Sequence, residues 1–313
     1  MIIAIYKKGI LMMGLTLEDR AKKIFADFNF ICERFSFDRS KISGKTSGWW
    51  LKPREQGRQT IIYLHGTGND ALYPQISLFI KLLSHGFQVL SIDLDGHGIH
   101  STTKLDPNRL SDCLADLLEQ VGFVPKDSSL HLIGQSLGGG VVLDFLANHR
   151  DSRICSATLI STPLHLNQLQ SFPYSELGSI FRGSMIRQFP LYGLYHLMPA
   201  VGVFKRRSYP IRLELAADKA HAFSYVETVA YAFDTMRLRD KAMKVNLPVL
   251  LCYGGKDHIA CSSHGRILHH LMPGSRLILI DGETHFTTLF AKITEESIIH
   301  WIQRWSRSSA ESS

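Results

Sequence analysis

Short apolar runs alternate with amphipathic stretches along the chain from about residue 60 to about residue 305. The apolar runs are bounded by turn residues and are too short for typical helices, which favours buried strands. The stretches between them repeat apolar residues every three or four positions, which indicates helices. The expected strands cover 60–64, 87–93, 129–133, 155–160, 248–253 and 276–280, and the expected helices lie near 73–85, 109–121, 137–149, 262–271 and 287–305. Because such alternation requires right-handed crossovers, the pattern predicts an α/β fold with a mostly parallel, doubly wound sheet covered by helices on both faces.

The opening segment follows a different pattern. Thr16 and the acidic residues after it form a helix start, and the apolar positions that follow keep a helical period. The segments 32–37 and 47–51 have the composition of strands, with a glycine-containing turn between them. They predict an antiparallel strand pair at the edge of the parallel core.

The expected strand 129–133 runs into Gly134, Gln135, Ser136, Leu137 and Gly138, and then into a helix of small residues. A serine hydroxyl becomes a good nucleophile when a base takes its proton, and a sharp turn from strand to helix exposes it to that base. Glycines on either side leave room for such a crowded turn. The setting therefore predicts a nucleophile elbow at Ser136; the alternative is a serine that only caps the helix.

Two more residues suited to a catalytic triad lie beyond the ends of later strands. Asp257 follows the apolar run 248–253, and His285 follows the last apolar run. Because the carboxyl ends of parallel strands meet at one edge of the sheet, these side chains are expected to converge on Ser136. We predict that His285 is the general base and that Asp257 is the acid that orients it. Asp281, four residues before His285, is the competing acid, with a strand-end turn as its alternative role.

A loop suited to stabilising an oxyanion follows the first core strand. It consists of His65, Gly66, Thr67 and Gly68. A tetrahedral oxyanion needs two fixed N–H donors, one after the nucleophile and one from the first loop of the core. We assign these donors to the backbone amides of Leu137 and Thr67. His65, and His97 in a later glycine-rich turn, are expected to hydrogen-bond to backbone and shape their loops.

With these four motifs in this order, the chain resembles the α/β-hydrolase superfamily of serine hydrolases, particularly its lidded branch of monoacylglycerol-lipase-like enzymes, esterases and thioesterases. The resemblance covers residues from about 55 to 305 and implies the α/β-hydrolase fold with a helical cap inserted after the sixth core strand. One departure stands out. Relatives commonly carry arginine before the Gly-His-Gly turn, where this chain has Asp95, so any ion pair made by that arginine is expected to be absent or reversed.

The expected cap has no strand pattern, contains several prolines and carries apolar aromatic clusters at 189–198 and 223–233. Its inner face would suit a hydrophobic acyl group, or its apolar residues simply seal it onto the core. The expected division is an N-terminal unit 1–54, a core of 55–162 and 246–306, a cap 163–245 and a flexible tail 307–313.

The formal charge of +7 is uneven: residues 1–60 carry +6, residues 163–245 carry +5, and the rest carries −4. This basic surplus favours weak contact with an anionic membrane surface or a phosphate-bearing acyl donor such as coenzyme A. The alternative is an ordinary solvated surface. Nothing in the sequence indicates a nucleic-acid partner, and it leaves the oligomeric state open.

No apolar run approaches the ~18 residues of a membrane span, and the apolar start before Lys7 lacks the features of a secretory signal. Met12 and Met13 offer alternative translation starts. Five scattered cysteines without C-x-x-C spacing favour a reducing cytoplasm over a disulfide framework or a zinc site. The histidines have no other metal-ligating residues at a suitable spacing in the sequence, so we expect no metal and no cofactor.

The predicted activity is cleavage of a carboxylic ester or thioester through an acyl-enzyme, with a small-molecule acyl substrate. Alternatives are an acyltransferase that uses the same acyl-enzyme, a serine peptidase, and a non-catalytic small-molecule receptor on the same scaffold. Dehalogenases and epoxide hydrolases are disfavoured, since they need a carboxylate where Ser136 stands.

Overall fold

The computed structural model describes residues 17–54, 59–67, 69–72, 75–98, 103, 106, 108–120, 122–166 and 222–310. Gly68, the aromatic cluster 189–198 and most of the expected cap lie outside these residues, as do 1–16 and 311–313. Residues 167–221 of the expected cap and 311–313 of the expected tail therefore stay predictions.

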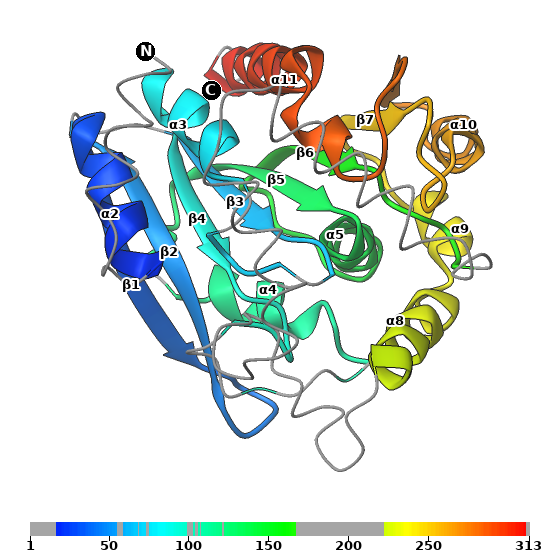
Figure 1. Cartoon of the computed structure of the whole chain (residues 1–313), viewed down its shortest axis with the longest axis horizontal. Helices are drawn as coiled ribbons and strands as arrows, with labels where there is room; N and C mark the ends of the chain where they lie inside the picture. The colour runs from blue at the N-terminus through cyan, green and yellow to red at the C-terminus, as the bar shows by residue number, and fades with distance from the viewer. Residues whose placement is uncertain are drawn as a thin grey trace.

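An eight-stranded sheet runs through the molecule in the order β1-β2-β4-β3-β5-β6-β7-β8 (Figure 1). The strands β1 and β2 are antiparallel to each other, β2 is antiparallel to β4, and the remaining neighbours are parallel. The strands are β1 Phe30–Asp38, β2 Lys45–Pro53, β3 Gln59–Leu64, β4 Gln88–Ile92, β5 Ser129–Gln135, β6 Ile154–Ile160, β7 Val249–Gly254 and β8 Ser275–Ile280. The predicted mostly parallel sheet with an antiparallel edge is confirmed.

The helices follow the predicted amphipathic stretches. They are α2 Leu17–Asp27, α3 Ile76–Ser84, α4 Asp112–Leu118, α5 Leu137–Asn148, α8 Ala222–Met236, α9 Leu238–Ala242, α10 Ser262–Leu271 and α11 Lys292–Ala310, with a 3₁₀ turn η3 at Thr287–Phe290. The predicted helix 287–305 is thus divided into η3 and α11, and the two are separated by Ala291 in extended conformation.

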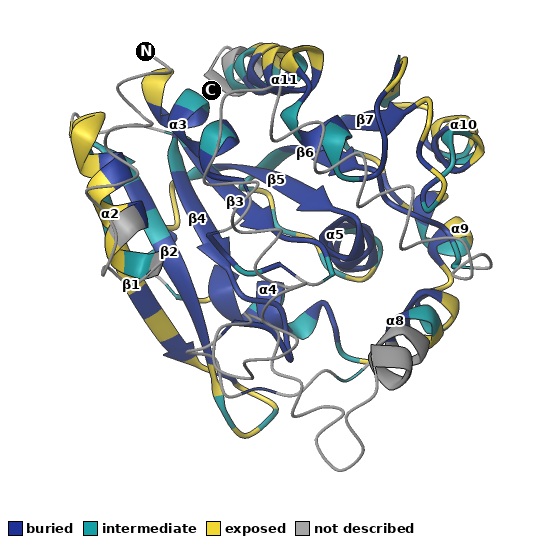
Figure 2. Cartoon of the chain, in the orientation of Figure 1, coloured by how far each residue is buried: buried dark blue, intermediate teal, exposed yellow. Residues whose placement is uncertain are grey.

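Alternating side chains of each central strand enter two separate cores, as the period of a strand requires. In β3, Ile62 and Leu64 join one core, whereas Ile61 and Tyr63 join the other. The first core includes apolar side chains of α4, α5 and α10, and the second includes those of α2, α3 and α11. Figure 2 shows the central strands buried between these helices. This double covering confirms the predicted three-layer arrangement.

Part of the expected cap is described. Helix α8 packs against α5: a Cβ added to Gly140 of α5 would lie 3.0 Å from Cε of Met236 and 3.2 Å from Cε1 of Phe233. The aromatic cluster 223–233 therefore contributes at least Phe233 to the core, in line with the sealing role. Within the described segments, no helix has the length and apolar character needed to cross a membrane.

Candidate active site

Ser136 occupies the sharp turn between β5 and α5, with φ 50° and ψ −114°. A non-glycine residue in such a conformation costs about 1–3 kcal/mol and persists only where its surroundings fix it. Here the N–H of Ser136 donates to the carbonyl of Ile160 at 2.8 Å, and its own carbonyl accepts the N–H of Gly139 at 3.0 Å. The serine hydroxyl does not cap the helix. The predicted strand–turn–helix setting is therefore present, and the capping alternative is not.

The two glycines of the elbow are required by close approach of backbone. A Cβ on Gly138 would lie 2.5 Å from the carbonyl carbon of Leu64, and one on Gly134 would lie 2.6 Å from the carbonyl carbon of Gly138. Gln135, between glycine and serine, is buried and accepts a hydrogen bond from the Tyr63 hydroxyl at 3.1 Å. The elbow is consequently packed directly against the end of β3.

The imidazole of His285 lies between Ser136 and Asp257. Its Nε2 is 3.0 Å from Oγ of Ser136, and its Nδ1 is 3.0 Å from Oδ2 and 3.1 Å from Oδ1 of Asp257. All three side chains are buried, with Ser136 the most exposed at 7%. The structure thus brings together the three residues that the strand ends predicted.

Backbone N–H groups of its own loop hold the carboxylate of Asp257. Its Oδ1 accepts the backbone N–H groups of Ile259 at 2.9 Å and Ala260 at 2.7 Å. These donors stabilise the ionised carboxylate and fix its direction. The competing acid, Asp281, is exposed in the turn after β8. Asp257 is therefore the carboxylate that meets the imidazole.

His65 anchors the loop after β3. Its Nε2 accepts the N–H of Leu94 at 3.0 Å, so the ring proton sits on Nδ1, which donates to the carbonyl of Gly66 at 2.8 Å. Burial, with a smaller contribution from His97, lowers the pKa of His65 well below its ordinary value. His97 in turn hydrogen-bonds through Nδ1 to the carbonyl of Asp95 at 3.0 Å. The predicted loop-shaping bonds of both histidines to backbone are confirmed.

These bonds orient the peptide between Gly66 and Thr67. The Gly66 carbonyl accepts from both His65 and the N–H of Asn69, the latter at 3.2 Å. In a trans peptide the C=O and N–H point in opposite directions, so the N–H of Thr67 faces away from both donors. The loop also binds the elbow, since the carbonyl of His65 accepts the N–H of Gly138 at 3.1 Å.

Leu137 opens helix α5, so its N–H has no acceptor within the helix. Gly66 lies close to the serine: a Cβ added there would be 3.2 Å from Cβ of Ser136. The peptide groups of Leu137 and Thr67 therefore both adjoin Ser136. Gly68, the remaining residue of the predicted oxyanion loop, is outside the described residues.

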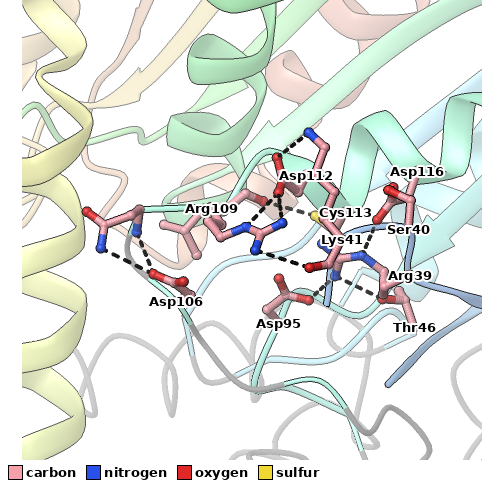
Figure 3. A network of polar contacts seen from close by, with 12 residues as sticks. Arg39, Ser40, Lys41, Thr46, Asp95, Asp106, Arg109, Asp112, Cys113 and Asp116 are labelled. Atoms are coloured by element: carbon pink, nitrogen blue, oxygen red, sulfur yellow. Dashed lines mark hydrogen bonds and ion pairs between the residues drawn. The ribbon is translucent and has the colours of Figure 1, made fainter. Parts of the chain in front are cut away.

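Asp95 forms an ion pair of reversed sense: its carboxylate meets the guanidinium of Arg39, which comes from the turn between β1 and β2 (Figure 3). Burial raises the pKa of the Asp95 carboxyl, and the charge of Arg39 opposes that rise. Arg39 was not among the residues that the sequence singled out. Nothing local distinguishes it from the other basic residues near the N-terminus, because its partner lies 56 positions further on.

Within the described ranges, no three His, Cys, Asp or Glu side chains are grouped as a metal ion would require.

Known proteins resemble this chain over most of its length. A family model described as the alpha/beta hydrolase fold matches residues 59–292. A pimeloyl-[acyl-carrier protein] methyl ester esterase of Neisseria meningitidis is 29% identical over 72% of this chain and 86% of its own. A bifunctional esterase/perhydrolase of Acinetobacter calcoaceticus is 25% identical over 72% of this chain and 84% of its own.

Solved structures share the fold at lower identity. An esterase from Exiguobacterium antarcticum superposes with a TM-score of 0.56 at 18% identity, covering 86% of this chain and 99% of its own. DcsB, solved in complex with a substrate analogue, gives a TM-score of 0.62 at 15% identity over 88% of this chain and 99% of its own. Since the family model spans most of the sequence and includes the elbow, Asp257 and His285, the chain belongs to the alpha/beta hydrolase fold family.

Proposed function

We propose that this protein is a serine hydrolase that cleaves a carboxylic ester or thioester through an acyl-enzyme on Ser136. One observation carries the proposal: the imidazole of His285 is within hydrogen-bonding distance of the Ser136 hydroxyl while its other nitrogen is held by Asp257. The relatives named as esterases support an ester as the substrate.

In the first step, Nε2 of His285 takes the proton of Ser136 as Oγ attacks the carbonyl carbon of the substrate. Asp257 accepts the Nδ1 proton in a hydrogen bond, which leaves Nε2 free to act as the base and stabilises the imidazolium that forms. The imidazolium then gives its proton to the leaving alcohol or thiol. Water repeats the sequence on the acyl-enzyme, and the acid is released.

The negative oxygen of each tetrahedral intermediate would bind the backbone N–H groups of Thr67 and Leu137. Two observations support this assignment. First, His65 and the N–H of Asn69 both donate to the Gly66 carbonyl, so the N–H of Thr67 points to the opposite side of that peptide and is not used by these two groups. Second, the N–H of Leu137 lies at the start of a helix, whose positive end favours an anion.

The acyl group is proposed to be hydrophobic, because the segment expected to cover Ser136 is rich in aromatic and aliphatic residues. A weak contact of its basic residues with an anionic membrane surface, a cytoplasmic location and the absence of a cofactor are part of the same proposal. All five cysteines are unpaired, which supports a reducing compartment.

The decisive experiment is kinetic. Aryl esters with acyl chains from acetyl to palmitoyl, together with acyl thioesters, are assayed with the wild-type chain and with Ser136→Ala. When the three residues of a triad act as a unit, removal of the nucleophile lowers turnover on the order of 10⁶-fold. Hydrolysis that survives in Ser136→Ala removes the assignment of the nucleophile.

Product analysis separates the alternatives. Transfer of the acyl group to an added alcohol or amine in preference to water identifies an acyltransferase, and cleavage of peptides but not esters identifies a peptidase. Tight ligand binding without turnover in the wild-type chain identifies a receptor. Preference for short acyl groups throughout contradicts the hydrophobic acyl site.

A further inference from the structure

Figure 3 shows a cluster of charged side chains in which Arg39 meets two aspartates. The Arg39 side chain is fully buried and binds two carboxylates: Nη1 meets Asp95, and Nε is 2.5 Å from Oδ2 of Asp116. The hydroxyl of Thr46 accepts from Nη1 at 3.3 Å, and the hydroxyl of Ser40 donates to Asp116. The cluster joins three parts of the fold: the β1–β2 turn, helix α4 and the turn after β4.

The two carboxylates belong to different parts of the fold and have different neighbours. Asp116 is a residue of helix α4. Asp95 follows Leu94, whose N–H donates to Nε2 of His65, and its own carbonyl binds Nδ1 of His97. The rings of His65 and His97 are in edge-to-face contact with centroids 5.0 Å apart. Asp95 therefore connects the buried arginine to the loop that follows β3.

That loop is sensitive to small movements of Leu94. If its N–H withdraws, Nε2 of His65 loses the donor that keeps the ring proton on Nδ1, and the bond from Nδ1 to the Gly66 carbonyl weakens. The Gly66 carbonyl then keeps the N–H of Asn69 but loses His65, so the Gly66–Thr67 peptide and the N–H of Thr67 are fixed less tightly. Displacements of about 1 Å at such donors lower rates on the order of 100-fold.

A contribution to folding stability alone does not explain why charged side chains are buried in this cluster. A buried ion pair adds little to stability relative to apolar residues of the same size, because desolvation of both charges offsets their attraction. What it adds is a fixed geometry, since a guanidinium between two carboxylates has few alternative arrangements.

We propose that Arg39 and Asp95 are positioning residues for the reaction: their ion pair fixes the turn 94–97, which holds His65 and thereby the N–H of Thr67. The proposal rests on the proposed function, in which that N–H binds the oxyanion. Neither side chain touches the reacting atoms.

The test compares Asp95→Asn with its matched control, Asp116→Asn. Each variant keeps the shape of the side chain and leaves Arg39 with one carboxylate, so each is expected to fold. For Asp95→Asn we expect kcat on an aryl ester to fall about 10- to 100-fold with KM within about 3-fold, because only the transition state carries the oxyanion. For Asp116→Asn we expect kcat within about 3-fold of wild type.

Amide hydrogen exchange gives a readout independent of activity. In Asp95→Asn, the peptides covering 60–67 and 88–98 should exchange faster than in wild type, whereas in Asp116→Asn they should not. Unchanged kcat in Asp95→Asn, or equal losses in both variants that follow their unfolding midpoints, overturns the proposal. Ester hydrolysis that survives in Ser136→Ala overturns the proposed function instead, and the exchange data still report whether Asp95 holds the turn.

Discussion

Nε2 of His285 lies 3.0 Å from Oγ of Ser136, although 149 positions separate them in the chain. The contact exists because β5 and β8 are parallel strands of one sheet, so the loops after them leave at the same edge. The strained turn at Ser136 presents the hydroxyl, and Asp257 sets the direction of the ring. The fold therefore brings the three side chains together.

Substitution of Gly138 by alanine should separate the elbow from the loop after β3. The new Cβ would meet the carbonyl groups of Leu64 and His65, at 2.5 Å from the former's carbon and 2.6 Å from the latter's oxygen. We expect a loss of about 1–3 kcal/mol in the free energy of unfolding and a large fall in kcat. Gly140→Ala is the control, because its Cβ meets the flexible end of Met236 at 3.0 Å and alanine favours the helix. Denaturant unfolding and ester kinetics of both variants check the prediction; equal behaviour would refute it.

Asp257→Asn should lower kcat about 10⁴-fold with little effect on folding, because an amide in that place stabilises the wrong tautomer of His285. Asp281→Asn is the matched control, since Asp281 is exposed and lies only a few residues from the histidine. Its kcat should stay within about 2-fold of wild type. The reverse order of the two effects would mean that the wrong carboxylate has been assigned.

Removal of Arg39 should destabilise the fold far more than removal of an exposed arginine. Arg39→Ala leaves the carboxylates of Asp95 and Asp116 buried without their cation, which costs about 3–5 kcal/mol in the free energy of unfolding. Arg237 pairs with Asp240 on the surface, where it is 76% exposed, and Arg237→Ala should cost less than about 1 kcal/mol. Chemical denaturation measures both; similar losses would contradict the role given to the buried cluster.

Acid should destabilise the protein through its buried histidines. Burial lowers the pKa of His131 from 6.5 to about 4. The unfolded chain binds this proton first, so the stabilising contribution is complete above about pH 6.5 and is lost as the pH falls toward about 4. We expect Tm to fall over that window, and His131→Gln to make the fall shallower. His258→Gln, at an exposed position, should leave the slope unchanged. Parallel slopes in all three proteins would rule out His131 as a cause.

The positions of the strands and the three residues beyond their ends could be predicted because both depend on short-range patterns. The apolar runs of β5, β7 and β8 are bounded by turn residues, and parallel strands necessarily bring their carboxyl ends together. Ser136 comes directly after such a run, and Asp257 and His285 lie in the loops that follow theirs, so their meeting could be expected from topology without any distance being known.

Arg39 could not be predicted, because its role depends on two carboxylates that reach it through tertiary packing. The departure at Asp95 indicated that an ion pair would be absent or reversed, but not which basic residue would supply the opposite charge. The break between η3 and α11 was missed for a related reason. The hydroxyl of Thr288 donates to the carbonyl of Thr284, and the carbonyl of Thr288 accepts from the hydroxyl of Thr294. The periodicity of apolar residues does not reveal such local hydrogen bonds.

Covalent labelling measures whether His285 activates Ser136. A fluorophosphonate probe is added to wild type, Ser136→Ala and His285→Ala, and the adducts are followed by intact-protein mass spectrometry with peptide mapping. We expect one adduct per wild-type chain, on Ser136, no adduct on Ser136→Ala, and labelling of His285→Ala that is slower by orders of magnitude. An adduct on another residue, or equal labelling rates with and without His285, would contradict the activation of Ser136 by His285.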